Sequence, residues 1–169
     1  LKNEIFLKRE DLQDVFSFKI RGAYNKMSKL TNSQLSQGVI TSSAGNHAQG
    51  VAMSAQKLNC QATILMPITT PLVKVNAVKN LKAKVILFGD NYDETYKEAI
   101  RISRERNLCF IHPFDDPEVI AGQGTIAIEL EQQLKDKPYA IYIAVGGGGL
   151  ISGISLYIKK IWPEVKIIG

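Results

Sequence analysis

The chain of 169 residues carries 21 Lys and Arg against 16 Asp and Glu, a net charge of +5, and 45% of its residues are hydrophobic. This balance is typical of a soluble globular protein and excludes a collagen-like repeat, an acidic disordered tail and a low-complexity linker. The apolar runs are far shorter than the roughly 20 residues of a membrane-spanning helix, so none is expected. Cys60 and Cys109 lie beside apolar runs and are expected to be buried free thiols, which favours a reducing, cytoplasmic location.

Both ends of the chain lie in apolar runs that favour strands, Ile5 to Leu7 at the start and Val165 to Gly169 at the close. The sequence shows neither an initiator Met nor a signal peptide. We therefore expect a fragment of a larger protein, with apolar surface left exposed where the remaining part would cover it.

Runs rich in β-branched residues alternate with segments of helical periodicity along the chain. Before the closing run, strands are expected at residues 38–42, 61–66, 84–88, 108–112 and 139–145. The apolar spacings between them predict helices that include residues 48–58, 71–81, 96–103, 126–134 and 150–162. This order predicts an α/β protein with parallel twisted sheets and helices on both faces, whose ligands bind beyond the carboxyl ends of the strands.

The densest basic stretch contains four lysines, Lys74, Lys79, Lys82 and Lys84, with apolar residues between them at helical spacing. That spacing favours the solvated face of an amphipathic helix. No aromatic side chains lie among the lysines, as a base-stacking surface would require. We therefore expect neither a nucleic-acid nor a membrane partner.

Four consecutive glycines, Gly146 to Gly149, lie between an expected strand and an expected helix. Backbone N–H groups without a neighbouring Cβ can approach an anion closely, and a helix N-terminus favours negative charge. The run is not a P-loop, and it fits the dinucleotide fingerprint poorly because Ser152 stands where Gly or Ala is expected. The pattern favours a phosphate site over a loop that needs only the backbone freedom of glycine.

A second loop, from Ser42 to His47, also enters a helix from a strand. Its free N–H groups could hold a carboxylate, and Asn46 adds a side-chain amide. An ordinary helix cap supplied by Ser42 or Ser43 is an equally good interpretation. The two histidines, His47 and His112, have no carboxylate at ligand spacing, so no metal site is expected.

Lys19 lies where a helix is expected to begin, and an ordinary exposed lysine is the simplest interpretation. A nucleophilic lysine must lose its proton. A helix N-terminus contributes about 0.3–1 kcal/mol, less than one pKa unit at about 1.36 kcal/mol, so desolvation would have to lower the pKa of Lys19 further. The adjacent pair Asp115 and Asp116 is expected to form a solvated turn.

Three segments occur in order along the chain: Ser17-Phe18-Lys19-x-Arg21-Gly22-Ala23, Ser43-Ala44-Gly45-Asn46-His47, and Gly146 to Leu150. Together they resemble the threonine dehydratase family of fold-type II pyridoxal-phosphate enzymes, most closely its biosynthetic form. The resemblance covers nearly the whole chain and implies a tryptophan synthase β-like fold, here incomplete. It implies that residues 39–117 form a small mobile subdomain, and that residues 1–38 and 118–169 are parts of the large cofactor-binding subdomain.

The resemblance also implies pyridoxal 5′-phosphate as the cofactor and assigns a role to each matching residue. Lys19 would form the Schiff base and act as the catalytic base, Phe18 would pack beside the pyridine ring, and Asn46 would hydrogen-bond its 3′-hydroxyl. The phosphate would be held by backbone N–H groups of Gly146, Gly147, Gly148, Gly149 and Leu150. The loop for the substrate carboxylate would comprise Ser43, Ala44, Gly45, Asn46 and His47.

The implied reaction is β-elimination of threonine, and of serine, to 2-oxobutanoate or pyruvate and ammonia, which begins isoleucine biosynthesis. The Lys19 amine would remove the α-proton, and the β-hydroxyl would leave with a proton. The resemblance implies a small amino acid as substrate and a homo-oligomeric full-length enzyme. The fragment alone is expected to be inactive.

Serine racemase or serine dehydratase is the nearest alternative within the same fold. Racemases of this family carry a serine where Ala44 stands, and its hydroxyl can deliver a proton to the face opposite the lysine. Ala44 has no proton to give, so dehydration is expected to dominate. Cysteine synthases usually have Thr-Ser-Gly-Asn-Thr in this loop, which differs at Ala44 and His47. An alternative from another class is a catalytically silent phosphate- or nucleotide-binding module.

Overall fold

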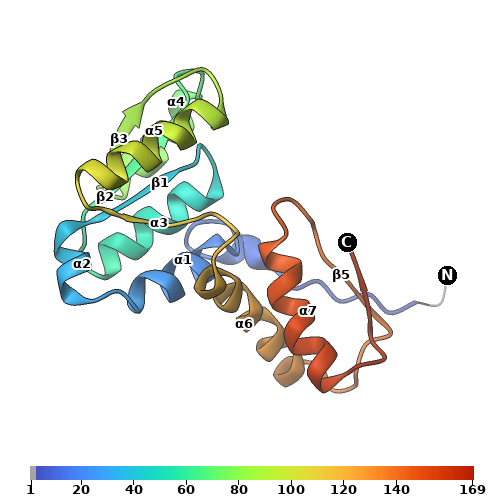
Figure 1. Ribbon diagram of the computed structural model, residues 1–169. Helices are drawn as coiled ribbons and strands as arrows, with labels where there is room; N and C mark the ends of the chain where they lie inside the picture. The colour runs from blue at the N-terminus through green and yellow to red at the C-terminus, as the bar shows by residue number, and fades with distance from the viewer. Residues whose placement is uncertain (1–2) are drawn as a thin grey trace.

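The computed structural model describes residues 3–169 as an α/β protein with two separate parallel sheets (Figure 1). In chain order its elements are η1 (Glu10–Leu12), α1 (Lys19–Ser28), α2 (Asn32–Gln37), β1 (Val39–Ser42), α3 (Asn46–Lys57), β2 (Ala62–Met66), α4 (Leu72–Asn80), β3 (Lys84–Leu87), α5 (Tyr92–Glu105), β4 (Cys109–Phe110), α6 (Pro117–Gln133), β5 (Ala140–Tyr142), α7 (Gly149–Ile161) and β6 (Lys166–Ile168). The strict alternation of strands and helices from β1 onward confirms the predicted fold class.

The larger sheet has the strand order β3-β2-β1-β4, and all neighbouring strands are parallel. In register, Val39 of β1 pairs with Ala62 of β2 on one side and with Cys109 of β4 on the other. Successive side chains of a strand point to opposite faces, and both faces of this sheet are apolar. One face packs on α3 and α4 and the other on α5. We call β1–β4 with these three helices the four-stranded unit.

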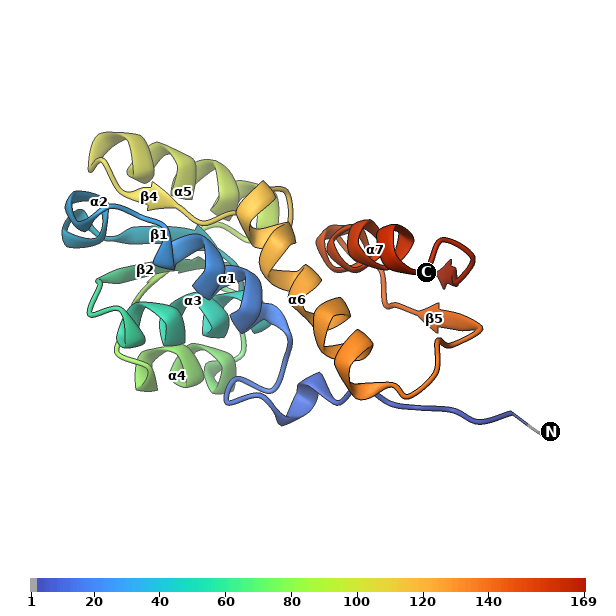
Figure 2. The same ribbon diagram turned by 90° about the horizontal axis from the view of Figure 1, so that it is seen from below.

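Strands β5 and β6 form a two-stranded parallel sheet of their own, connected through α7. These elements and α6 share a core around Ile126, Ile154 and Ile158. We call β5, β6 and α7 the two-stranded unit. Figure 2 shows α6 between the two units, where it packs against α7 and against α1. Because α1 also packs on α3, the pair α1 and α6 joins the two units.

Glycines allow α6 to cross both neighbouring helices at close range. A Cβ added to Gly122 of α6 would lie 2.6 Å from the carbonyl oxygen of Arg21 in α1. One added to Gly153 of α7 would lie 2.3 Å from the carbonyl oxygen of Ile120 in α6. Backbone contacts of this kind cannot be relieved by rotating a side chain. These crossings therefore fix where α1 lies relative to α7.

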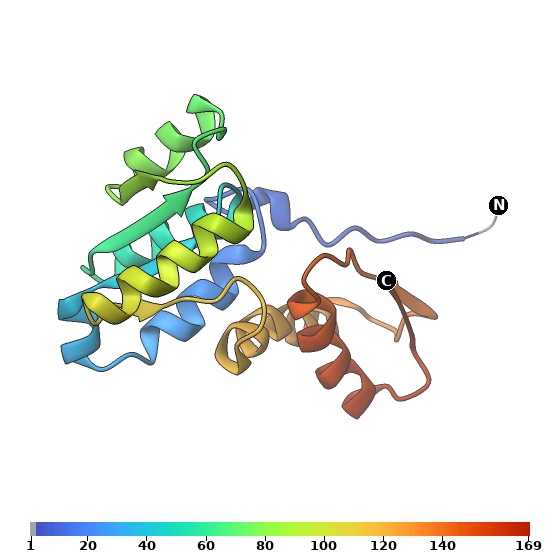
Figure 3. The ribbon, with the colours of Figure 1, turned by 45° about the horizontal axis from the view of Figure 1, so that its top comes forward.

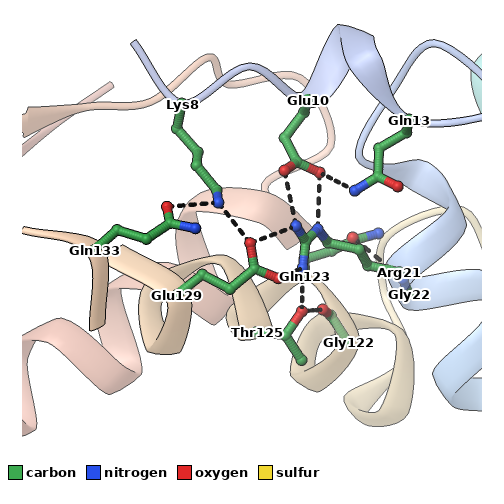
Figure 4. Close-up of polar contacts among 10 residues, drawn as sticks. All are labelled: Lys8, Glu10, Gln13, Arg21, Gly22, Gly122, Gln123, Thr125, Glu129 and Gln133. Carbon is green, nitrogen blue, oxygen red and sulfur yellow. Dashed lines mark hydrogen bonds and ion pairs between the residues drawn. The ribbon is translucent and has the colours of Figure 1, made fainter. Parts of the chain in front are cut away.

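Arg21 joins α1 to the N-terminal segment and to α6 (Figure 4). Its guanidinium donates to the Glu10 carboxylate at 2.7 and 2.8 Å and to the Glu129 carboxylate at 2.5 and 2.9 Å. Lys8 also donates to Glu129, at 2.5 Å. The Arg21 guanidinium is the main reason that the pKa of Glu129 falls to about 2. The ion pairs with Glu10 and Glu129 therefore attach the first turn of α1 to the N-terminal segment and to α6.

Some expected strands differ from the observed ones. The strand expected from Ile5 to Leu7 is wrong: these residues pair with no strand and their side chains are exposed, and Figure 3 shows the segment as an extended run outside the four-stranded unit. The expected strands 108–112 and 139–145 shorten to β4 and β5. The paired ladders are short: β5 pairs with β6 over Ala140–Tyr142, and β4 pairs with β1 over Cys109–Phe110. One further backbone hydrogen bond follows each ladder, from Ile143 to Ile168 and from Ile111 to Ile40.

The remaining general expectations have mixed outcomes. The four lysines of the basic stretch are all exposed, as expected, but only Lys74 and Lys79 lie on a helix, α4, because that helix ends at Asn80 before Lys82 and Lys84. Cys60 and Cys109 are free thiols as expected, but they are half-buried rather than fully buried. Within residues 3–169, no helix is both long enough and apolar enough to span a membrane.

Candidate functional site

The three sequence motifs lie at helix N-termini that no side chain caps. The N-cap residues of α1, α3 and α7 are Phe18, Gly45 and Gly148, and none of these helices has an acidic residue in its first turn. Of the other α-helices, α2, α5 and α6 are capped by the side chains of Thr31, Asn91 and Asp116, whereas α4, which begins after Pro71, has no side-chain cap either. The motif helices therefore offer free N–H groups and positive dipole ends, an arrangement that suits an anion.

Lys19 is the first residue of α1, and its side chain is partly buried. Its Nζ donates to the carbonyl oxygen of Pro113 at 2.8 Å and lies 5.4 Å from the centre of the Phe18 ring. The backbone of Lys19 rests on α3, where a Cβ added to Gly50 would lie 3.0 Å from the Lys19 carbonyl. Burial lowers the pKa of the Lys19 amine below its ordinary value of 10.5. The interpretation of Lys19 as an ordinary exposed lysine is therefore wrong.

The loop before α3 is held by its own polar groups. The N–H of Ser43 donates to the carbonyl of Leu65 at 3.0 Å, and its hydroxyl accepts from the N–H of Gly45 at 3.2 Å. Gly45 is the N-cap and supplies no side chain, so the interpretation of this loop as an ordinary serine cap is wrong. Ala44 is partly buried, and Asn46 is exposed in the first helical turn. The helix start thus remains available to a ligand.

His47 is buried in the first turn of α3, with 3% of its surface exposed. Its Nε2 lies 3.0 Å from the carbonyl oxygen of Ile111, which also accepts from the hydroxyl of Thr41 at 2.8 Å. Because a carbonyl only accepts, Nε2 carries the proton, and Nδ1 is an acceptor with no partner among the residues described. Burial lowers the pKa of His47 to about 3, so its ring is neutral at pH 7.

The glycine loop before α7 is shaped mainly by Phe114. A Cβ added to Gly147 would lie 2.3 Å from the Phe114 ring, and one added to Gly149 would lie 2.8 Å from the Phe114 carbonyl oxygen. Gly148 has a φ of +88°, which disfavours a side chain. Close contacts with Phe114 and the positive φ therefore account for the glycines at three of the four positions. Gly146 has no neighbour within 4 Å of its added Cβ and no positive φ, so the fold alone does not require a glycine there.

One short segment, residues 111–115, connects all three motifs. The carbonyl of Ile111 binds His47, the carbonyl of Pro113 binds Lys19, and Phe114 supports the glycine loop. Sequence reasoning missed these contacts, since it treated His112 only as a possible metal ligand. The adjacency of His112 and Pro113 at the end of a strand is the only sequence signal for this segment. Within residues 3–169, no group of three or more metal-binding side chains is placed to hold an ion.

The pair of aspartates that follows is only partly a solvated turn. Asp115 is exposed, as expected. Asp116 instead caps α6, where its carboxylate accepts from the N–H of Glu118 at 2.8 Å, and it pairs with Lys26 of α1 at 2.8 Å. The expectation is therefore wrong for Asp116, because its carboxylate holds α1 against the start of α6.

The residues present fit a ligand that combines an anionic group with a carbonyl that reacts with an amine. The glycine loop offers backbone N–H groups to the anion, and the space beside Gly146 is open. Phe18 packs with the core of the two-stranded unit, which also includes Leu150 of the glycine motif. The charge of Lys19 lowers the pKa of His47 in the first turn of α3, and its amine binds Pro113, the residue before the Phe114 that packs on the glycine loop. This arrangement suits a phosphorylated aldehyde such as pyridoxal phosphate.

Comparison with known proteins gives consistent results. The model of the family described as "Pyridoxal-phosphate dependent enzyme" matches residues 1–169. The biosynthetic, chloroplastic threonine dehydratase of Arabidopsis thaliana is 61% identical over 165 residues, which are 98% of this chain and 28% of that protein. The chain spans only 27–28% of the length of this relative and of the threonine dehydratases of Nicotiana attenuata and Solanum lycopersicum that it also matches.

Two solved structures share the fold. Processed threonine deaminase isoform 2 from Solanum lycopersicum superposes with a TM-score of 0.93 at 56% identity, over 96% of this chain and 44% of that one. Maize serine racemase superposes with a TM-score of 0.89 at 37% identity, over 94% of this chain and 48% of that one. With a family model that matches its whole length, the chain belongs to the pyridoxal-phosphate dependent enzyme family.

Proposed function

We propose that this chain is the N-terminal part of the catalytic domain of a threonine dehydratase. The full-length enzyme would convert threonine to 2-oxobutanoate and ammonia, and serine to pyruvate and ammonia, at the start of isoleucine biosynthesis. The observation that carries the proposal is the partly buried Lys19 amine, which donates to Pro113 in the same short segment that contacts the loops before α3 and α7. The 61% identity to a biosynthetic threonine dehydratase supports this choice of substrate.

Pyridoxal phosphate, when bound, supplies the electron sink that makes loss of a proton from the substrate Cα feasible. In this proposal Lys19 holds the cofactor through Nζ, and Phe18 packs beside its ring. Asn46, exposed in the first turn of α3, is free to bind a hydroxyl of that ring. The phosphate is held by backbone N–H groups of the glycine motif, the same residues that the sequence resemblance implies: Gly146, Gly147, Gly148, Gly149 and Leu150.

The substrate carboxylate is assigned to the loop that begins α3. The exposed helix start offers N–H groups that no side chain caps, as a carboxylate requires. In this proposal the loop residues are Ser43, Ala44, Gly45, Asn46 and His47. The imidazole of His47 binds the Ile111 carbonyl through its only N–H, so the ring supports the loop from within the protein.

Lys19 is the base that takes the α-proton. Burial lowers its pKa, which increases the unprotonated fraction at neutral pH, and the Pro113 carbonyl gives the amine a fixed partner at 2.8 Å. His47 is a poor candidate for the base, because a pKa of about 3 leaves its conjugate acid too strong for proton uptake at pH 7. His112 accepts backbone N–H groups through Nδ1 and is not free for this role either.

The test is turnover of threonine by the full-length protein that contains these residues, with and without Lys19→Ala. Because one amine is both anchor and base, we expect the variant to lose at least about 10⁴-fold in kcat for 2-oxobutanoate formation. Release of 2-oxobutanoate is followed with a coupled dehydrogenase, and visible absorption reports cofactor binding. Retained turnover in the variant would contradict the role of Lys19. A wild-type protein that binds the cofactor but consumes no amino acid would support a silent binding module.

Serine racemisation is the second candidate, because maize serine racemase shares the fold at 37% identity. Ala44 argues against it, since a methyl group cannot deliver a proton to the substrate. Chiral chromatography of serine incubated with the full-length protein separates the two activities. Substantial D-serine would favour the racemase.

Three further properties belong to the same proposal. We assign residues 39–117 to a small mobile subdomain, and residues 1–38 and 118–169 to the large one. We assign the full-length enzyme to the cytoplasm as a homo-oligomer, although the Arabidopsis relative is named chloroplastic. Light scattering of the full-length protein tests the oligomer, and cell fractionation tests the compartment.

A further inference from the structure

The 111–115 segment touches every part of the candidate site, although the sequence resemblance gives it no role. Its first carbonyl, from Ile111, anchors the loop before α3 through His47. Its third residue, Pro113, accepts from the Lys19 amine. Its fourth, Phe114, packs under Gly147 and Gly149. A change in the backbone of this segment would therefore move the amine's partner and the glycine loop together.

The residue between these contacts, His112, closes the turn through its own side chain. Its Nδ1 accepts the backbone N–H of Asp115 at 2.8 Å and that of Phe114 at 3.3 Å. An imidazole nitrogen that accepts N–H groups carries no proton, so the ring is the neutral form protonated on Nε2. Burial, together with the charge of Lys19, lowers the pKa of His112, whereas Asp115 and Asp116 raise it; burial has the largest effect.

Aromatic neighbours hold the His112 ring in place. The Phe114 ring lies edge-on at 4.8 Å between centroids, and the rings of Tyr96 and Phe110 each lie at 6.1 Å. Tyr96 comes from α5 and Phe110 from β4, so two elements of the four-stranded unit fix the ring. Edge-to-face contacts at these distances favour one ring orientation. The acceptor nitrogen is therefore held toward the turn.

We infer that His112 is a positioning residue for the site: by accepting the N–H groups of Phe114 and Asp115, it fixes the turn that directs the Pro113 carbonyl at Lys19 and seats Phe114 against the glycine loop. The inference rests on the proposed function only in taking Lys19 and the glycine loop as the cofactor site. It requires no contact between His112 and the substrate or the cofactor.

Two substitutions in the full-length protein separate the acceptor from the rest of the side chain. His112→Asn keeps an acceptor oxygen at the same bond distance from the backbone as Nδ1. His112→Gln carries the same amide one carbon further out, near the position of Nε2, where it cannot close the turn. The two variants therefore differ in the position of the acceptor and hardly in polarity.

Two readouts do not depend on turnover. In protein freed of cofactor, hydrogen–deuterium exchange measures the protection of the Phe114 and Asp115 amides. Equilibrium titration with pyridoxal phosphate, followed by absorption, measures its dissociation constant. For His112→Gln we expect about tenfold faster exchange and about tenfold weaker binding, the size of one net hydrogen bond. For His112→Asn we expect both values within about threefold of wild type.

Thermal unfolding separates positioning from a general loss of structure. We expect the melting temperature of His112→Gln to stay within a few degrees of wild type while cofactor binding weakens. Wild-type affinity despite faster exchange in this variant would overturn the inference. So would weak binding by His112→Asn, which tests the inference even if His112→Gln fails to fold.

Neither readout involves an amino-acid substrate. A wild-type protein that binds pyridoxal phosphate without converting threonine would contradict the proposed function and leave the role of His112 intact. Conversely, an active dehydratase whose His112→Gln variant binds cofactor normally would contradict only the positioning role.

Discussion

The loops that lead into α3 and α7 differ in what holds them. The loop before α3 leaves a central strand of the four-stranded unit, and hydrogen bonds fix it: Ser43 binds Leu65 and Gly45. The loop before α7 leaves the two-stranded unit and is shaped by close contact with Phe114, which leaves no room for side chains at Gly147 and Gly149. Polar contacts thus define one loop, and the lack of side chains defines the other.

This difference predicts different sensitivities in the two loops. A loop held by hydrogen bonds should respond to pH and to loss of a donor or acceptor, because a buried polar group without a partner is costly. A loop held by close backbone contact should respond to added volume and hardly to pH. Both loops would serve the same cofactor and substrate, so the two kinds of change can be compared in one enzyme.

The largest effect is expected from Gly149→Ala in the glycine loop. The new methyl group would lie 2.8 Å from the Phe114 carbonyl oxygen, a backbone atom that no rotamer change can move away. Overpacking of this kind costs about 1–3 kcal/mol, which corresponds to roughly 10- to 100-fold weaker cofactor binding if the loop moves. Titration of the full-length protein with pyridoxal phosphate measures the dissociation constant of the cofactor.

Ser152→Ala is the matched control for that variant, since Ser152 is exposed on the same helix. We expect its affinity for the cofactor to equal that of wild type. Normal binding by Gly149→Ala would show that the glycine loop does not require its contact with Phe114.

An intermediate effect is expected from His47, which should make the loop before α3 sensitive to acid. Its pKa is about 3 in the folded protein and near 6.5 when unfolded, so the unfolded chain binds more protons between these values. The stability due to neutral His47 is complete above pH 6.5 and falls by about 1.4 kcal/mol per pH unit as the pH drops toward 3.

Chemical denaturation of the full-length protein between pH 6.5 and 5 measures this slope. His47→Gln keeps an amide N–H that can reach the Ile111 carbonyl, but it cannot titrate. We expect the variant to lose about 1.4 kcal/mol less per pH unit than wild type. Equal slopes in both proteins would show that His47 is not buried as a neutral ring.

The smallest effect is expected from Ala44→Ser in the same loop. Ala44 is partly buried next to Gly45, and a hydroxyl there would add a proton donor to a loop assigned to the substrate. We expect the rate of serine racemisation to rise about tenfold over background. This is less than the rate enhancement that a general acid in an evolved active site typically gives. Chiral chromatography of serine measures it. No increase would mean that the hydroxyl does not reach the substrate.

Much of the fold could be predicted from the sequence because local patterns determine it. The β-branched runs and helical spacings locate β1, β2 and β3 to within about two residues. Strand length could not be predicted in the same way. An apolar run such as 139–145 becomes a strand only where a partner runs beside it, and β6 supplies three paired residues. The short helix α2 was missed, although Thr31 and Gln34 form a capping box.

The candidate site was predicted only where a motif is contiguous. The two loops stand out in the sequence, and Lys19 is assigned through the family resemblance of its motif, whereas their common support in residues 111–115 depends on contacts across many positions. The hydrogen bond from Lys19 to Pro113 joins residues 94 positions apart, and that from Arg21 to Glu129 joins residues 108 apart. No signal in the sequence marks Gly50 of α3 as the position against which the backbone of Lys19 packs. Such pairings arise from the packing of α1 against α3 and α6.

The central claim is that Lys19 is the lysine that holds pyridoxal phosphate between the two loops. Reduction of the full-length holoenzyme with borohydride, followed by proteolysis and mass spectrometry, tests it directly, because reduction fixes the cofactor on the lysine that carries it. We expect a pyridoxyl-phosphate modification on Lys19 in wild type and its loss in Lys19→Ala. A modification at another lysine in wild type, or none at all in cofactor-loaded protein, would contradict it.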